Sequence, residues 1–423
     1  MFPFWKYALS LALAVLGALP ALGQPTTLSL YDLLAEVEAA NPTLRAARLD
    51  AAALATRSDQ VALPDPMLAV TAFPYPILTA RGAQRSQWRV EQRLPRWGTL
   101  ALRRDAADRA AEVAGYEADV LAADLALQIK QAYIALYRVQ QTVALVARFQ
   151  ARLDAFAEAA AVRYEVGRGT QGAILQAQVE RGRLEERLLA LAAQRRTALE
   201  TLTRLTDRPG LRLDSVALAP PRIADADTAL VALARRTRPE LRALDAAQAQ
   251  AEITTALAQR AFYPDFGLSA TYFDIADRDA PPTADGRDAL ALGVGVTVPL
   301  WRGALRARLD EARLREAQLA ARRDALDADI ETHVAELVFT AQQERATLDL
   351  YRDRLIPQAE TAAASLLSAY TTGEAEFLTL LDAERTLFAL RTGAEDATAR
   401  LLAAIAALER AVGAPLETGT PHD

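Results

Sequence analysis

The chain repeats the same series of short motifs about 200 residues apart, which constrains its fold more than any other feature. Asn-Pro-Thr-Leu-Arg at 41–45 returns as Arg-Pro-Glu-Leu-Arg at 238–242, and Leu-Pro-Arg-Trp-Gly at 94–98 returns as Val-Pro-Leu-Trp-Arg-Gly at 298–303. A Tyr-x-x-Gly motif followed by Leu-x-Ala occurs at 164–177 and again at 370–383. The same order in both halves indicates a tandem duplication. We expect a first repeat at 24–206, a linker at 207–227, a second repeat at 228–413 and a tail at 414–423.

Residues 1–23 are predicted to be a secretory signal peptide. They carry one charge, Lys6, followed by an apolar run at 7–19 and small residues before Gln24. A membrane anchor is the alternative, but the run is short and no stop-transfer pattern follows it. No later run reaches about 18 apolar residues, so membrane contact would have to use strands or a surface. An exported chain is therefore expected.

Composition excludes several classes of protein. The formal net charge of −6 argues against a nucleic-acid partner. Cysteine is absent, which excludes disulfides and thiolate metal sites. Gln24 stands where a lipoprotein would need its acylated cysteine, so we expect no lipidation. Stability must then come from packing and from association.

Each repeat is predicted to contain one very long helical hairpin, at about 99–206 and about 304–412. Residues 99–163 have no proline and a single glycine, Gly115, and a helix of that length reaches roughly 100 Å. Gly167 and Gly373 follow the two outgoing helices and suit a left-handed C-terminal cap at the hairpin tips. Pro357 is expected to break or kink the second long helix.

Each repeat is also predicted to contain one β-hairpin, at about 66–95 and about 265–300, with loops at 74–87 and 274–288. Residues 290–300 alternate between bulky apolar and small side chains. The first hairpin has an apolar face that includes Trp88, opposite a charged face formed by Arg89, Glu91 and Arg93. Such strands match a transmembrane barrel, with membrane-interface aromatics at its rims. The candidates for these rims are Trp88, Trp97, Tyr272 and Trp301.

Two alternatives remain for this β part. A small sheet could pack on its own helices, because alternation alone does not exclude that arrangement. A membrane sheet of four strands would leave open edges that cannot face lipid. Closure would then require other copies of the chain, with about eight strands from a dimer and about twelve from a trimer. The predicted fold is mainly α with a small β part, and its closed form would be a conduit.

At this point the residues resemble the TolC-like outer-membrane efflux protein family over about 28–413. The resemblance rests on the duplication, the Asn41-Pro42 start, the Leu-Pro-Asp-Pro segment at 63–66, the Val-Pro-Leu exit at 298–300 and the two Tyr-x-x-Gly tips. It implies a homotrimer with an α-helical barrel in the periplasm and a 12-stranded transmembrane β-barrel in outer-membrane lipid. It also implies two partners, a periplasmic adaptor (membrane fusion) protein and an inner-membrane pump of the RND type.

The resemblance also assigns roles to particular residues. The adaptor-contacting tips would be Val166, Gly167, Arg168, Thr372, Gly373 and Glu374. Asp382 falls where the family can place an acidic ring that narrows the tunnel and favours cations, and Tyr370 keeps its place beside this periplasmic gate. A solvated helix charge is the alternative for Asp382. The chain departs from the family pattern at Gly172, Ala173, Ala375 and Thr379, so the polar lock of some members is expected to be missing or rebuilt.

No constellation for catalysis or for a resident metal or cofactor is visible. The only two histidines are His333 and His422, without a repeated ligand spacing. We therefore expect no enzyme activity and no cofactor. Residues 63–67 and the arginine-rich stretch after Trp97 are nearest the heavy-metal branch of the family, so heavy-metal cations are the expected cargo. Drug efflux and type I secretion are alternatives, and a periplasmic coiled-coil scaffold or adaptor without a pore is an alternative of another class.

Overall fold

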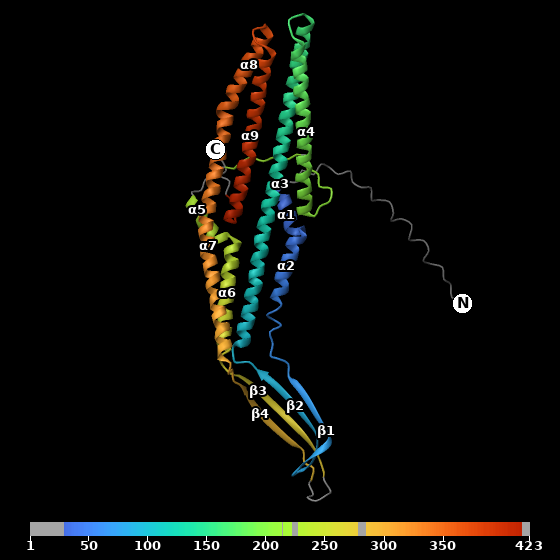
Figure 1. The fold of residues 1–423 in the computed structure, drawn as a ribbon, viewed down its shortest axis with the longest axis vertical. Coiled ribbons are helices and arrows are strands. Elements are labelled where there is room, and N and C mark those ends of the chain that lie inside the picture. Colours follow the sequence, from blue (N-terminus) through green and yellow to red (C-terminus); the bar gives the residue numbers. More distant parts are fainter. Residues whose placement is uncertain (1–28, 214, 222–226, 278–284, 417–423) are drawn as a thin grey trace, which may run out of the picture.

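The molecule is a long bundle of helices with a small sheet at one end (Figure 1). The computed structural model describes residues 29–213, 215–221, 227–277 and 285–416. The expected signal peptide, Gln24, His422 and most of the C-terminal tail lie outside the described residues. The chain is mainly helical with one small sheet, as the sequence predicted.

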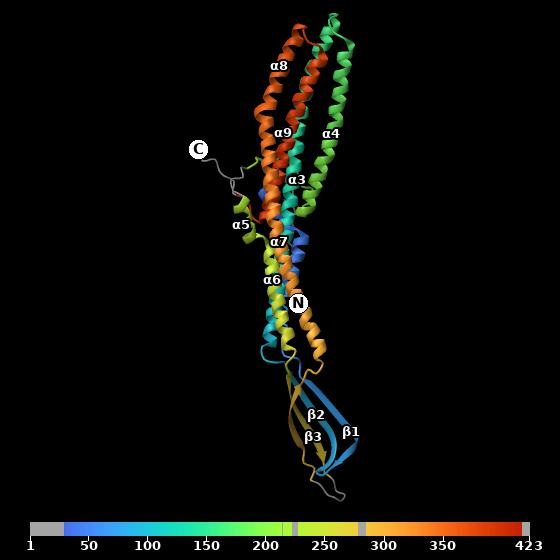
Figure 2. The same ribbon diagram turned by 60° about the vertical axis from the view of Figure 1, so that its left-hand side comes forward.

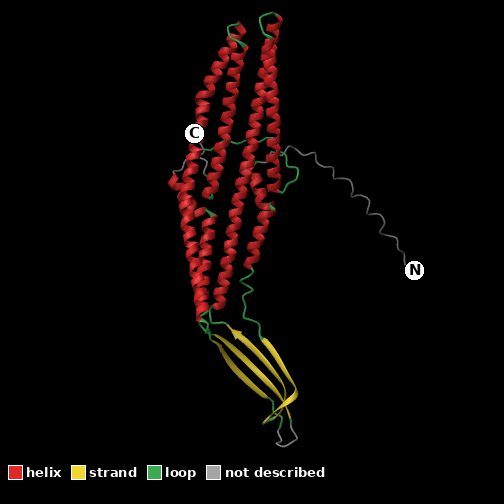
Figure 3. Cartoon of the chain, viewed as in Figure 1, coloured by secondary structure: helices red, strands yellow, loops and turns green. Residues whose placement is uncertain are grey.

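The order of elements in the first half of the chain recurs in the second half. The first half contains α1 (Leu30–Ala40), α2 (Pro42–Ala55), β1 (Met67–Thr79), β2 (Gly82–Leu94), α3 (Thr99–Glu165) and α4 (Gln171–Thr206). The second contains α5 (Asp227–Thr237), α6 (Pro239–Arg260), β3 (Asp265–Ala276), β4 (Ala289–Thr297), α7 (Arg302–Leu350), a π-helical turn η1 (Tyr351–Leu355), α8 (Ile356–Thr372) and α9 (Phe377–Val412). Figure 3 shows the sheet beyond the ends of the helices.

Asn41 explains why the first repeat begins with an Asn-Pro motif. Its side-chain oxygen accepts hydrogen bonds from the backbone N–H groups of Thr43 and Leu44 at 3.0 Å, which caps α2. Its amide nitrogen donates to the Leu205 carbonyl at 2.8 Å, at the end of α4. Pro42 then fits the first turn, where its missing N–H costs nothing. One buried side chain thus joins the α1–α2 corner to the end of the helical hairpin.

The four strands form one antiparallel sheet in the order β1-β2-β3-β4, so β2 and β3 join the two repeats. The loop expected at 74–87 is wrong, because β1 continues to Thr79 and β2 begins at Gly82. Pro74 and Pro76 are compatible with β1 because it is an outer strand of the sheet, where a missing N–H breaks no ladder bond. The register shifts between Ala72 and Ile77, at these prolines.

The second long helix is interrupted where Pro357 predicted a break or kink. The turn Tyr351–Leu355 is π-helical, and α8 begins directly after it with Pro357 in its first turn. Tyr351 lies against α9 at Gly393, where an added Cβ would stand 2.8 Å from the Tyr351 hydroxyl. The first long helix, α3, has no such interruption.

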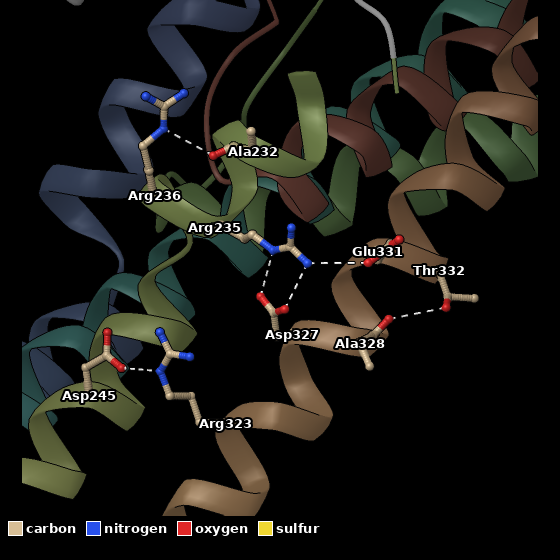
Figure 4. Close-up of polar contacts among 9 residues, drawn as sticks. All are labelled: Ala232, Arg235, Arg236, Asp245, Arg323, Asp327, Ala328, Glu331 and Thr332. Atoms are coloured by element: carbon tan, nitrogen blue, oxygen red, sulfur yellow. Dashed lines mark hydrogen bonds and ion pairs between the residues drawn. The ribbon is translucent and has the colours of Figure 1, made fainter. Parts of the chain in front are cut away.

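Ion pairs hold the short helices of the second repeat onto α7 (Figure 4). Arg235 of α5 makes a two-pronged contact with Asp327 at 2.8 and 2.9 Å. Asp245 of α6 accepts from Arg323 at 2.7 Å. These pairs are largely exposed, so they orient the helices. Most of the stability comes from the buried apolar side chains between α5, α7 and α9, such as Leu230, Ile330 and Leu408.

Arg410 of α9 makes a less exposed contact that joins three helices. It donates to Asp124 of α3 at 2.7 Å and to Glu240 of α6 at 2.6 Å, and its side chain is only 14% exposed. Burial alone would raise the pKa of Glu240, but hydrogen bonds from Arg238 and Arg410 hold that pKa below its usual 4.5. Glu240 is therefore ionised in the neutral fold.

We predict that Arg410→Met destabilises the protein by about 3 kcal/mol at neutral pH, because it leaves the Glu240 carboxylate half-buried without its closest cation. The penalty should shrink in acid. A lowered folded pKa contributes stability above the usual value near 4.5, and this contribution is lost as the pH falls through the folded pKa. Thermal unfolding between pH 7 and pH 4 measures both effects. Arg322→Met, at an exposed position on α7, is the control, and equal melting of the two variants at pH 7 would contradict the prediction.

Candidate functional site

The sheet carries an exposed apolar face. Cross-strand partners share a face, and the register aligns Val70, Trp88, Tyr272 and Leu290 across all four strands. The large apolar side chains exposed on this face are Leu68, Val70, Trp88, Val90, Phe266, Leu268, Tyr272, Leu290, Leu292, Val294 and Val296. In Figure 2 the sheet extends away from the helical bundle. The alternative of a sheet packed on its own helices is therefore wrong.

The opposite face of the sheet is polar or made of small side chains. Arg89 of β2 donates to the Thr271 hydroxyl of β3 at 3.3 Å, and Glu91 lies opposite Ser269 on the same face. On β4, Gly293 stands opposite Ser269, and an added Cβ there would lie 2.7 Å from the Ser269 hydroxyl. One sheet thus presents an apolar surface on one side and a hydrated surface on the other, as a membrane barrel requires.

Aromatic residues lie at both ends of the apolar face. Trp88 and Tyr272 are cross-strand partners, and the next pair on their face is polar, with Ser86 donating to Asp274 at 3.1 Å. Trp88 lies in the middle of β2 rather than at its end, because β2 extends further than expected. On β2 and β3 it still marks the point where apolar side chains give way to polar ones, whereas β1 continues with the exposed Ile77 and Leu78. Tyr272 also donates a hydrogen bond to Asp288.

The other two expected aromatics lie at the helical end of the sheet. Trp97 is 88% exposed and its ring packs 6.3 Å from that of Phe266, while Trp301 is also exposed. Trp88 and Leu94 are separated by roughly 20 Å along the strand at about 3.3 Å per residue. For strands tilted by about 40°, this length corresponds to a height of about 15 Å between the two residues, which is part of the apolar band of about 25 Å expected for a membrane barrel.

Among the described residues, no helix combines the length and hydropathy needed to cross a membrane.

The two hairpin tips lie at the opposite end of the molecule from the sheet and are closed in the same way. Gly167 and Gly373 adopt left-handed backbone angles, with φ of 72° and 90°. In each tip the glycine N–H and the following N–H return to the last helical turn, with Arg168 donating to the Arg163 carbonyl and Glu374 to the Ala369 carbonyl at 2.8 Å. Of the expected tip residues, Val166 is the C-cap of α3, whereas Thr372 is the last residue of α8 and Gly373 is its C-cap.

Tyr370 is buried between the two hairpins. Its ring packs edge-on against Phe377, and the Arg163 guanidinium lies 4.7 Å from the centre of the ring. Arg163 also donates a hydrogen bond to the Tyr370 carbonyl. Arg163 therefore ties the end of α3 to the end of α8. This contact could not be predicted from the sequence, because Arg163 is one of many helical arginines and its partner lies 207 residues away.

Asp382 belongs to a charged cluster that spans the hairpins. Arg385 of α9 donates to Glu180 of α4 at 2.6 Å and to Asp382 at 3.2 Å. The hydrogen bond from Arg385 to Glu180 raises the pKa of the Arg385 guanidinium, so this side chain stays charged. Asp382 itself is 69% exposed, whereas the Glu180 side chain is buried. The acidic position therefore has a cation beside it, which the sequence analysis did not anticipate.

A second ion pair links α3 to α9 just beyond this cluster. Arg152 places one guanidinium nitrogen 3.0 Å from both oxygens of the buried Glu384 carboxylate. At the positions that depart from the family pattern, Ala375 bonds only through its backbone and Thr379 is exposed. The polar contacts between the hairpins thus include those of Arg152 and Arg163 on α3 and of Arg385 on α9.

Within the part of the chain that the structure describes, no group of three or more His, Cys, Asp or Glu side chains could hold a metal ion. His333 is exposed on α7, with Nδ1 4.0 Å from a Glu336 oxygen.

Comparison with known proteins places these features in a family context. Residues 230–414 match the sequence model described as outer membrane efflux protein. The chain is 24% identical to outer membrane efflux protein BepC of Brucella suis over 287 residues, which is 68% of this chain and 62% of the length of that relative. The second repeat thus carries the sequence pattern of this family.

Solved structures of outer-membrane channels have the same fold as this chain. The outer-membrane channel OprN has a TM-score of 0.75 at 19% identity, covering 91% of this chain and 89% of its own. The outer membrane protein VceC of Vibrio cholerae has a TM-score of 0.73 at 22% identity, covering 92% of this chain and 97% of its own. The described fold is therefore that of outer-membrane channel proteins, whereas the match to the heavy-metal branch is not specifically supported.

We predict that Arg163→Met loosens the end of α8 without unfolding the molecule. It removes a charged hydrogen bond and a cation–π contact, so hydrogen exchange at 366–374 should accelerate by roughly tenfold, given about 1.5 kcal/mol for a charged hydrogen bond. Arg168→Met is the control, because the Arg168 side chain makes no hydrogen bond, ion pair or ring contact among the described residues. Equal exchange rates in the two variants would show that Arg163 does not hold the tip.

Proposed function

We propose that this chain is the outer-membrane exit duct of a tripartite efflux system, passively conducting cargo across the periplasm and the outer membrane. The exposed apolar face of the sheet, bounded by aromatics and backed by a polar face, is the observation that carries the proposal. The match of the second repeat to the efflux family and the shared fold with outer-membrane channels support it. A periplasmic scaffold or adaptor without a membrane part would leave this apolar face exposed to water, which is unfavourable.

The edges of the sheet supply the argument for a trimer. β1 and β4 are the outer strands of the described sheet, and unpaired backbone groups in lipid cost several kcal/mol each. Pairing β1 of one copy with β4 of the next removes every edge. Two copies would give eight strands, whose interior is about filled by side chains, whereas three copies would give twelve and leave a lumen. A duct therefore favours the trimer.

The helices then form the periplasmic part of the duct. α3 has 67 residues and extends about 100 Å from the sheet to the tip. The two tips would meet a periplasmic adaptor protein through Val166, Gly167, Arg168, Thr372, Gly373 and Glu374, and the adaptor would connect the duct to an RND-type inner-membrane pump. The chain would be exported with its signal removed before Gln24, and without a lipid anchor.

The cargo class is proposed on narrower grounds. The similarity of residues 63–67 to the heavy-metal branch and the acidic position at Asp382 favour cations. Three copies of Asp382 around an axis would attract cations at the periplasmic entrance, with Tyr370 packed one turn beyond the tip. Drugs or polypeptides remain the alternative cargo of the same duct.

We expect the full-length protein to fractionate with the outer membrane and to run as a heat-labile trimer in detergent. Reconstituted into planar bilayers, it should conduct ions, because the polar face of the sheet would line the lumen. The boiled sample is the control for conductance. A monomer recovered from the soluble periplasm would refute the proposal.

We further expect Asp382→Asn to weaken the cation preference of that conductance. Arg385 keeps its shorter bond to Glu180, so the substitution should remove a charge without unfolding the cluster. Reversal potentials in a salt gradient measure the preference. Glu374→Gln, an acidic position on the tip turn, is the matched control. Identical reversal potentials for wild type and Asp382→Asn would assign Asp382 to the solvated surface.

A further inference from the structure

A cavity of about 940 Å³ lies where the sheet meets the helices. It is lined by the β2–α3 connection, the end of α6 and the start of β3, including Arg96, Trp97, Arg260, Tyr263 and Phe266. A second cavity of about 280 Å³ shares Arg96, Trp97 and Phe266 with it and continues to Leu94 and Leu63. The two cavities together extend from the arginines Arg96 and Arg260 to the end of the apolar face of the sheet at Leu94.

The larger cavity contains two arginines without a carboxylate partner. The Arg96 guanidinium stacks over the Tyr263 ring at 3.7 Å, and Arg260 donates to the Trp97 carbonyl. Asp265 accepts only the backbone N–H of Arg96, at 2.9 Å. Among the described residues, no acidic oxygen lies within ion-pair distance of either guanidinium. Two cations therefore share a cavity without a counterion.

The backbone around the cavity adds to its positive character. Gly98 is the N-cap of α3 and offers no side-chain acceptor to the first amides of this 67-residue helix. Gly98 also has a left-handed φ of 78°, and an added Cβ would lie 2.7 Å from an Arg260 nitrogen. The absence of a side chain at this position lets Arg260 approach the helix end. The start of α3 and both guanidiniums then favour an anion.

The smaller cavity has mostly apolar walls and adjoins the exposed apolar face of the sheet. Leu94 and Phe266 are cross-strand partners on the exposed apolar face, and Trp97 packs beside Phe266. A ligand whose anionic group is bound by the arginines could therefore place an apolar chain along the sheet. Phosphate suits the guanidinium forks, and an acyl chain suits the aromatic wall.

We propose that this cavity binds an anionic phospholipid of the periplasmic leaflet of the outer membrane. The lipid phosphate lies on Arg96 and Arg260, and one acyl chain lies along Trp97, Phe266 and Leu94. This inference rests on the proposed function, since it needs the apolar face to meet lipid. It adds a specific lipid site that fixes the depth of the sheet in the membrane.

The test uses full-length trimers in detergent, titrated with equimolar phosphatidylglycerol and phosphatidylcholine of identical chains, with bound lipid counted by native mass spectrometry. Wild type should retain phosphatidylglycerol in preference by roughly 20-fold, since each arginine near a lipid surface contributes on the order of a factor of five. Arg96→Gln/Arg260→Gln should lose that preference. Arg196→Gln/Arg322→Gln removes the same charge from exposed positions on α4 and α7 and should keep it.

The possible outcomes separate this inference from the proposed function. Equal retention of the two lipids by wild-type trimers overturns the lipid site while leaving the duct intact, whereas the absence of outer-membrane trimers overturns the duct. Competition by glycerol phosphate as effective as that by the lipid would assign the site to a soluble phosphate and refute the lipid. If the double variant does not assemble, Arg96→Gln alone should reduce the preference by about fivefold.

Discussion

One helix, α3, is the element on which the two repeats depend. It packs against α2 and α4 of its own repeat and against α6 and α9 of the other. Its inward positions are mostly small or aliphatic, such as Ala132, Leu136 and Val139, so neighbouring backbones can approach closely along its length. The interior of a rod this thin contains few residues in any cross-section. The apolar contacts that stabilise the bundle are therefore distributed along its axis, in several buried clusters rather than in one central core.

Polar contacts between helices add to this apolar packing. Arg410, in the last turn of α9, joins this helix to α3 and α6, and Arg152 and Arg163 reach from α3 to the second hairpin near the tips. Each of these arginines keeps its aliphatic stem against the helices and places its guanidinium on an acidic or carbonyl oxygen. Long basic side chains that cross between helices thus add polar links to the apolar packing and the β2–β3 pairing that join the two repeats.

Much of the architecture could be predicted from the sequence, because it depends on local patterns. Alternation in residues 290–300 predicted a strand with one apolar face, Gly167 and Gly373 predicted the left-handed caps of the tips, and Pro357 predicted a break in the second long helix. The extent of β1 was missed because Pro74 and Pro76 resemble loop signals, whereas an outer strand accepts them.

The candidate site was harder to predict, because its contacts join residues far apart in the chain. Glu180 and Arg385 lie 205 residues apart, and neither differs in its local pattern from the other charges on α4 and α9. The same holds for Arg163 and Tyr370, whose pairing depends on how the two hairpins lie together. Asp382 could be singled out only by resemblance, and its ion pair with Arg385 could not be predicted from the local pattern.

The π-helical turn at 351–355 makes the two hairpins mechanically unequal. An unbroken helix such as α3 resists bending along its whole length, whereas a wide turn followed by a proline lacks part of the regular hydrogen-bond ladder and concentrates bending at one place. A sideways force on the tips would therefore bend the second hairpin mainly at this turn, whereas the first hairpin would resist bending along its whole length. Gly393 of α9 leaves room for Tyr351 beside this turn, so a side chain at position 393 would press on the place where bending concentrates.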